Sequence, residues 1–387
     1  MNRRWTLLFA VVLGSALFAC TKKAPSGSDD KGGQTQGQTA QAEGTPWKWI
    51  RTQESVVHAV ALLVHGRGQN PDELEDVVET LNSLGIDVLR VHLIGHPQGP
   101  ETAAGLGAWL RQLEQAYKQV VQDASRTKGQ LPVFGVGYSL GGALLVRLIQ
   151  QAREEPILFS KLVLLAPAIA FTKELDKAME VLQGVHQSAD DKALQRLQRL
   201  WGYLFAELKE TLNTDGEEGE RYKEFFSAIP DTTSGAERFG RNLVDALKGE
   251  EAAWDSIRGD VPDELRPELD SIMDLEPETQ SYEPFGEVLL QVDLALKTIA
   301  DTMLHGKRRA LQKQSTLIFI DPQELLVSEQ NIQEKVIEPL DLSPRWRIES
   351  MVGAGHRGLI QITEIPDMTE QLEQFLGLFR PDEDEDV

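Results

Sequence analysis

The segment LPVFGVGYSLGGALLVRLI, residues 131–149, places a serine between two glycines where two apolar runs meet. This Gly-x-Ser-x-Gly pattern is weak evidence alone, because glycine and serine are common. Here it follows a strand-like run and opens a helix-like run, the setting in which a nucleophilic serine is exposed. A helix beginning at Leu140 would point its N–H groups at Ser139 and favour negative charge there. The alternative is a helix-capping serine in an ordinary turn.

A serine hydroxyl is a poor nucleophile without a neighbouring base. His356 is the best-placed histidine, because MVGAGHRGL lies between a strand-like run and the last helix-like run. His92 and His96 are four residues apart but not on a helix, so we expect no metal site. A loop histidine without a catalytic role remains the alternative for His356. The other histidines lie in a strand, in a glycine turn or in the long middle segment: His58, His65, His186 and His305.

Two carboxylates compete to orient this histidine, and both follow the strand-like run TLIFI in the segment DPQELLVSEQ. Glu324 stands three residues beyond the strand end, far enough to turn back toward His356. Asp321 stands at the strand end with a shorter reach, and Pro322 fixes the backbone just after it. We favour Glu324 and keep Asp321 as the alternative acid. Capping of the following turn is a third interpretation for both.

Strand-like and helix-like runs alternate around these residues, which predicts an α/β fold with a mostly parallel sheet and helices on both faces. The strand-like runs are 56–66, 86–95, 131–139, 161–170, 315–321 and 345–353. The helix-like runs are 71–85, 106–126, 140–154, 328–338 and 363–378.

A long segment, residues 171–312, interrupts this alternation without a convincing strand. Apolar residues at helical spacing predict one helix from Leu194 to Leu212, and prolines divide much of the remainder. We therefore expect a helical insertion. It would separate the first part of the core, 46–170, from the second part, 313–380.

These motifs resemble those of the α/β-hydrolase family, over most of residues 55–378. LLVHGRGQ at 62–69 is similar to the family's His-Gly motif, and LIGHPQG at 93–99 is similar to its Gly-His turn. The resemblance implies the α/β-hydrolase fold, with the helical insertion as a cap over the site.

The resemblance also implies roles for individual residues. The backbone N–H groups of Arg67 and Leu140 would form the oxyanion hole. Ser139, Glu324 and His356 follow the family order of nucleophile, acid and base. A glutamate in the acid place departs from the commoner aspartate.

The closest resemblance is to capped esterases, including monoglyceride-lipase-like and lysophospholipase-like enzymes. It implies a serine hydrolase that cleaves a small-molecule or lipid carboxylic ester through an acyl-enzyme and needs no cofactor. Two alternatives stay open. One is peptide or amide hydrolysis by the same residues, and the other is a non-catalytic binding protein of the cell envelope that retains the fold.

The first 20 residues are predicted to be a signal peptide, with Arg3 and Arg4 before an apolar run. LFAC, ending at Cys20, resembles the lipobox of bacterial lipoproteins, in which the cysteine is acylated. Cys20 is the only cysteine of the chain, so it cannot form an internal disulfide. The resemblance implies membrane attachment in the cell envelope through Cys20. An ordinary signal peptide is the alternative.

The composition of the whole chain is that of a globular protein, because 41% of its 387 residues are hydrophobic and 26% are charged. Residues 21–45 are rich in Gly, Ser, Gln and Thr and predict a flexible linker, and residues 381–387 form an acidic tail. The net charge of −22 repels phosphates, so we expect no nucleic-acid partner.

Overall fold

The computed structural model describes the core of the chain and part of the helical insertion. The predicted signal peptide with Cys20, the linker 21–45 and the acidic tail 381–387 lie outside the described residues, as does most of the helix predicted from Leu194 to Leu212. The described residues are 46–96, 104–126, 130–151, 157–190, 193–194, 197, 233–248, 252–253, 255–256, 283–324, 326–365 and 367–378.

Seven strands form one sheet in the order β1-β3-β2-β4-β5-β6-β7. Every neighbouring pair is parallel except β1 and β3, which pair antiparallel at one edge. The predicted mostly parallel α/β sheet is therefore confirmed. The strands are β1 (Trp47–Ile50), β2 (Ala59–Val64), β3 (Ile86–Val91), β4 (Val133–Tyr138), β5 (Lys161–Leu165), β6 (Thr316–Ile320) and β7 (Trp346–Ser350).

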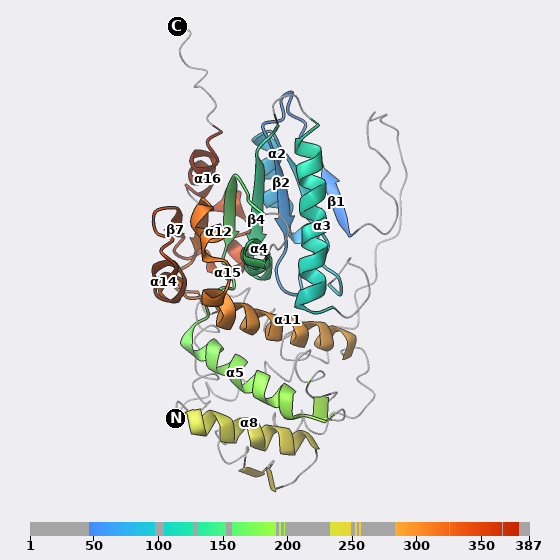
Figure 1. Ribbon diagram of the computed structural model, residues 1–387, viewed down its shortest axis with the longest axis vertical. Coiled ribbons are helices and arrows are strands. Elements are labelled where there is room, and N and C mark those ends of the chain that lie inside the picture. The colour runs from blue at the N-terminus through green and yellow to red at the C-terminus, as the bar shows by residue number, and fades with distance from the viewer. Residues whose placement is uncertain are drawn as a thin grey trace.

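Apolar side chains cover both faces of the sheet, as expected for parallel strands between helices. All six residues of β2 are buried, and they divide between the two faces. One face packs against α3 and α4, and the other against α2 and α16, as Figure 1 shows. These helices are α2 (Glu75–Ser83), which continues η2 (Pro71–Leu74), α3 (Leu106–Ala124), α4 (Leu140–Gln151) and α16 (Met368–Leu376).

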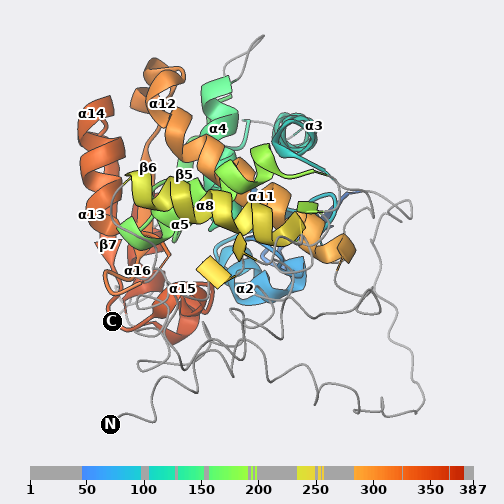
Figure 2. The ribbon, with the colours of Figure 1, turned by 90° about the horizontal axis from the view of Figure 1, so that it is seen from below.

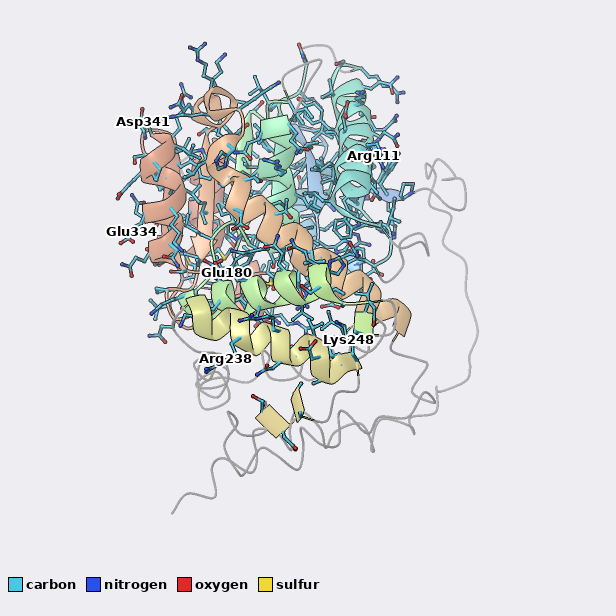
Figure 3. The ribbon with its side chains drawn as sticks, turned by 60° about the horizontal axis from the view of Figure 1, so that its bottom comes forward. Arg111, Glu180, Arg238, Lys248, Glu334 and Asp341 are labelled. Atoms are coloured by element: carbon cyan, nitrogen blue, oxygen red, sulfur yellow. The ribbon has the colours of Figure 1, made fainter. Side chains whose placement is uncertain are left out.

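The predicted helical insertion is present between β5 and β6, and no described residue of 171–312 belongs to a strand. Figure 1 shows α11, α5 and α8 stacked beyond one end of the sheet, and Figure 2 shows the same helices from below. Figure 3 labels Glu180 on α5 and Arg238 on α8. The helices are α5 (Lys173–Ser188), α8 (Thr233–Lys248), α11 (Glu283–Thr302), η5 (Met303–His305) and α12 (Arg308–Lys313).

Helix α11 joins the insertion to the core. It packs against α3 and α4 on one side and against α5 on the other. Lys297 of α11 is almost fully buried and donates to Asp176 of α5 at 3.0 Å and to Asp301 at 2.9 Å. The hydrogen bond to Asp176 links α11 to α5 within the insertion.

The predicted runs extend beyond several of the observed elements, as at β5, which ends at Leu165 and not at 170. Two larger differences concern whole elements. β1 has no counterpart among the predicted strands, because four residues are too few for an alternation to be recognised. The helix-like run 328–338 is not one regular helix. It consists of α13 (Glu329–Ile332), a π-helical turn η6 (Gln333–Ile337) and α14 (Glu338–Leu340).

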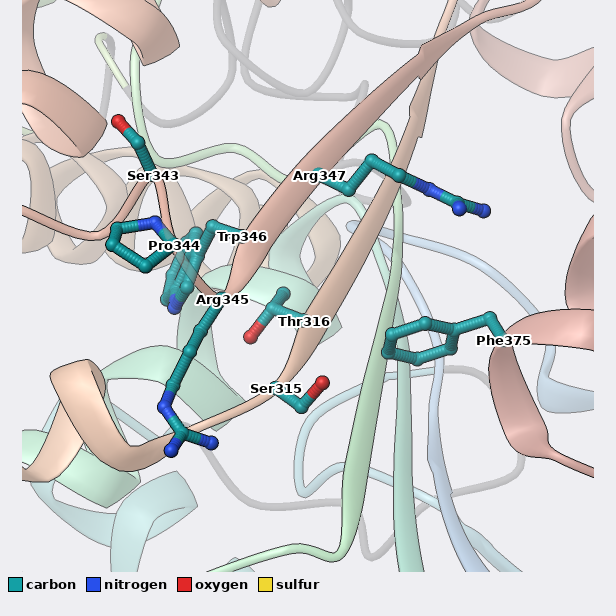
Figure 4. Close-up of a pocket in the computed structure, with 8 residues that line it drawn as sticks. All are labelled: Ser315, Thr316, Ser343, Pro344, Arg345, Trp346, Arg347 and Phe375. Carbon is teal, nitrogen blue, oxygen red and sulfur yellow. The ribbon is translucent and has the colours of Figure 1, made fainter.

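A hollow of about 550 Å³ opens where β6 and β7 begin (Figure 4). Ser315, Arg345 and Phe375 are among the residues that line it. This is the end of the sheet opposite to Ser139, which follows the last residue of β4. The hollow therefore plays no part in the candidate site. Within the described part of the chain, no helix has the length and apolar character needed to cross a membrane.

The junction of β4 with α4 leaves no room for side chains. A Cβ on Gly141 would lie 2.1 Å from the carbonyl oxygen of Val64, and one on Gly137 would lie 2.7 Å from the backbone of Gly142. Glycine at these positions therefore lets α4 pack directly on β2 and β4.

We predict that Gly141→Ala lowers the free energy of unfolding by about 3 kcal/mol or more, at the upper end of overpacking effects, because backbone atoms must move. Gly184→Ala is the matched control, since a Cβ there meets nothing within 4 Å. Alanine in that helix should stabilise the protein by about 0.5–1 kcal/mol. Urea unfolding measures both changes, and equal stability of the two variants would contradict this account of the junction.

Candidate active site

Ser139 lies on a sharp turn between the end of β4 and the start of α4. Its φ of 49° is in the left-handed region, which non-glycine residues seldom adopt. The backbone is held on both sides: its N–H donates to Leu165 at 2.8 Å, and its carbonyl accepts from Ala143 at 3.2 Å and Ala168 at 3.1 Å. The turn thus presents the hydroxyl at the carboxyl end of β4.

His356 reaches the serine from the loop after β7, in the short helix α15 (Gly355–Gly358). Its Nε2 lies 3.0 Å from Ser139 Oγ. The hydroxyl of Tyr138 donates to the carbonyl of His356 at 3.2 Å. Burial raises the pKa of Tyr138 well above its usual value, so this hydroxyl stays a donor at neutral pH.

Glu324 completes a continuous chain of side chains. Its Oε1 is hydrogen-bonded to Nδ1 of His356 and also accepts from the N–H of Val327 at 3.1 Å. An ionised carboxylate can only accept, so the proton of the neutral imidazole lies on Nδ1. Nε2 is then the acceptor that faces the hydroxyl of Ser139. All three side chains are buried.

Asp321 lies close to these three hydrogen-bonded side chains but does not bond the side chain of His356. Its Oδ1 accepts from the N–H of Gln323 at 2.9 Å, and its Oδ2 accepts from the N–H of Gly355 at 2.7 Å. The structure therefore places Glu324 on the imidazole and Asp321 on the backbone of the two loops. Asp321 ties the loop that carries the acid to the loop that carries the base.

The loop after β2 contains the first predicted oxyanion donor, Arg67, and is held by its neighbours. The N–H of Gly66 donates to Gln69 Oε1 at 2.9 Å. His65 Nδ1 lies 2.8 Å from the carbonyl of Gly66, and its Nε2 accepts from the N–H of Leu93 at 3.1 Å. The second predicted donor, Leu140, directly follows the serine as the first residue of α4.

A contact that the sequence analysis missed joins this loop to the helical insertion. Arg67 Nη2 forms an ion pair with Asp293 Oδ2 of α11, 226 positions away. Only 3% of the Asp293 side chain and 17% of the Arg67 side chain are exposed. Burial lowers the pKa of Arg67, and Asp293 opposes that effect. The available sequence signal was that Asp293 interrupts the apolar run VLLQVDLAL of this helix.

Two neutral histidines pack together beside the loop after β2. The rings of His65 and His96 are 5.1 Å apart, and His96 stands 5.7 Å from Trp109, both edge to face. Burial lowers the pKa of His65 well below 6.5 and that of His96 to about 4, with a further lowering of the latter by Arg67. Neither ring carries charge at neutral pH.

No described group of three or more His, Cys, Asp or Glu side chains is arranged to hold a metal ion. The side chains brought together are instead a hydroxyl, an imidazole and a carboxylate. This set can activate the hydroxyl: the imidazole accepts its proton, and the carboxylate stabilises the imidazolium that results.

The sheet order, the strand–serine–helix turn and the position of the histidine after the last strand define an α/β-hydrolase fold. The family described as serine aminopeptidase, S33 matches residues 55–230, which include Ser139 but neither Glu324 nor His356. The chain has the α/β-hydrolase fold, and the family match covers the first part of the core and ends within the helical insertion. No curated protein sequence matches it.

Among solved structures, the chain is similar to a soluble variant of monoglyceride lipase from Saccharomyces cerevisiae, with 13% identity, a TM-score of 0.47, and 85% of this chain and 91% of that one covered. It is also similar to MenH from S. aureus, with 13% identity, a TM-score of 0.46, and coverages of 86% and 98%. An esterase from Exiguobacterium antarcticum has 14% identity, a TM-score of 0.44, and coverages of 86% and 94%.

The buried neutral His96 predicts acid sensitivity. Because its folded-state pKa is depressed to about 4, the unfolded chain binds more protons between pH 6.5 and 4, so stability falls as pH falls through this window. Between pH 7 and 4.5 the free energy of unfolding should fall for the wild type and for His96→Asn. The fall should be smaller in His96→Asn by about 2–3 kcal/mol.

Urea unfolding at the two pH values measures this difference. His305→Asn, on an exposed position, is the matched control and should keep the acid sensitivity of the wild type. An unchanged pH dependence in His96→Asn would contradict the buried, neutral state of this ring.

Proposed function

We propose that the protein is a serine hydrolase that cleaves carboxylic esters through an acyl-enzyme, with Ser139 as nucleophile, His356 as base and Glu324 as acid. The observation that carries the proposal is the unbroken hydrogen-bond chain from Ser139 Oγ through both ring nitrogens of His356 to Glu324 Oε1. Each atom in it has the donor or acceptor character that its role requires.

In the proposed reaction, Ser139 Oγ attacks the ester carbonyl while His356 Nε2 takes the hydroxyl proton. The N–H groups of Arg67 and Leu140 stabilise the resulting oxyanion. The imidazolium then gives its proton to the departing alcohol, which leaves an acyl group on Ser139. A water molecule, deprotonated by His356, attacks this acyl group and releases the acid.

Glu324 holds His356 in the productive tautomer throughout these steps. Its carboxylate accepts the Nδ1–H and offsets the positive charge that forms on the ring. Burial strengthens this interaction, since the surroundings screen it less than water does. The bond from the N–H of Val327 to the same oxygen fixes the direction in which Glu324 points.

An ester is the preferred substrate because an alcohol is expelled more easily than an amine, and the helical insertion would form a cap that selects it. A small-molecule or lipid ester as the substrate rests on the resemblance of the sequence motifs to those of capped esterases. We also propose attachment to the membrane through Cys20, which rests on the lipobox-like sequence alone.

Amide hydrolysis is the second candidate, and the name of the matching family favours it, since that family is described as a serine aminopeptidase. The same three residues could cleave an amide. Rates with p-nitrophenyl esters and with amino-acid p-nitroanilides separate the candidates. Faster hydrolysis of the anilides at equal concentration would replace the ester proposal with the amide proposal.

A retained fold without catalysis is the remaining alternative, and Ser139→Ala tests it. We predict that wild type is labelled by a fluorophosphonate probe, whereas Ser139→Ala loses labelling and ester hydrolysis. Only one hydroxyl is removed, so the free energy of unfolding should change by about 0.5 kcal/mol or less. Labelling that persists in Ser139→Ala would transfer the nucleophile to another serine.

The two carboxylates predict opposite phenotypes. Glu324→Gln should lower kcat by up to about 10⁴-fold with KM little changed, because the productive tautomer is lost. Asp321→Asn should retain most of kcat but lower the free energy of unfolding by about 1–3 kcal/mol, since the amide offers only one oxygen to the N–H groups of Gln323 and Gly355.

Steady-state kinetics and urea unfolding of both variants, side by side, measure these effects. Each variant serves as the control for the other, because both replace a buried carboxylate by its amide in the same loop. An inactive Asp321→Asn beside a normal Glu324→Gln would assign the acid role to Asp321.

A further inference from the structure

We infer that Asp293 of α11 is a positioning residue for the oxyanion hole, which it serves through the side chain of Arg67. The inference rests on the proposed function, in which the N–H of Arg67 stabilises the oxyanion. It gives a residue of the helical insertion a part in the chemistry itself, in addition to any part in substrate selection.

The geometry of the loop is the first support. On one side of Arg67, Gly66 is held by the Gln69 side chain and His65 is held by the N–H of Leu93. On the other side, Gly68 has a φ of 61°, a conformation that glycine adopts without strain. Arg67 therefore lies in a tight turn, in which Gly68 is left-handed and the Gln69 side chain reaches back to the N–H of Gly66. The ion pair of its side chain with Asp293 extends from this turn to α11.

The burial of the pair is the second support. Two charges are removed from water between α11 and the core, where apolar side chains of similar volume could hold the helix as well. An apolar contact tolerates sliding and rotation, whereas a charged hydrogen bond fixes a distance and a direction. The pair thus sets where Arg67 lies relative to α11, which is itself packed on α3 and α4.

A displaced oxyanion donor has a recognisable kinetic signature. Oxyanion bonds form in the transition state, so their loss lowers kcat while ground-state binding stays. A boronic acid that forms a tetrahedral adduct with Ser139 should lose affinity in parallel with kcat/KM. A merely structural contact would affect stability without this parallel loss.

The test compares Asp293→Asn with Asp176→Asn, using p-nitrophenyl ester kinetics and boronic acid inhibition. We expect Asp293→Asn to lower kcat about 10- to 100-fold, less than the ~10²–10³ for outright loss of a donor. KM should stay within about twofold. Asp176→Asn removes the negative charge from a contact between α5 and α11 without touching the loop and should keep normal kcat. Asp293→Glu, which retains the carboxylate, should recover part of the lost kcat.

The double variant Arg67→Met, Asp293→Leu removes both charges and leaves none buried without its partner, so it tests the inference if Asp293→Asn folds poorly. It keeps the Arg67 backbone N–H, and we expect it to fold yet remain slow. Wild-type kcat in this variant, or raised KM with normal kcat in Asp293→Asn, would overturn the inference. A wild type that fluorophosphonate does not label would overturn the proposed function instead.

Discussion

The left-handed turn at Ser139 is the constraint on which the rest of the site depends. A side chain at a φ of 49° costs about 1–2 kcal/mol relative to ordinary backbone, so surrounding contacts must hold it. Three backbone hydrogen bonds and the close approach of Gly141 to Val64 do so. Because the turn fixes Oγ at the carboxyl end of β4, the loops after β6 and β7 need only bring an acid and a base to a known point.

Two carboxylates have different roles in the loops after β6 and β7. Both carboxylate oxygens of Asp321 accept hydrogen bonds from backbone N–H groups, one in its own turn and one in the loop of His356. Glu324 is thereby left to bond the imidazole. The longer side chain suits this place, because Asp321 already occupies the strand end. A glutamate in the acid place is thus consistent with an aspartate that acts as a structural brace three positions earlier.

The parts that could be predicted from the sequence are those encoded locally. β4, Ser139 and α4 are contiguous, so periodicity and the glycines were enough to predict a strand–turn–helix. The longer buried strands were predicted for the same reason, whereas β1 consists of four residues and was missed. The pairing of Arg67 with Asp293 spans 226 positions and leaves no local pattern. The choice between Glu324 and Asp321 depended on loop geometry, which spacing alone constrains weakly.

The central claim is that Ser139 carries the acyl group during turnover. The most direct measurement is peptide mass spectrometry of the protein after acid quenching during hydrolysis of a p-nitrophenyl ester, with full-length chain and excess substrate. The account predicts the mass of the acyl group on the peptide that contains Ser139, and its disappearance once substrate is exhausted. Ester turnover without an adduct on that peptide, or with the adduct on another residue, would contradict it.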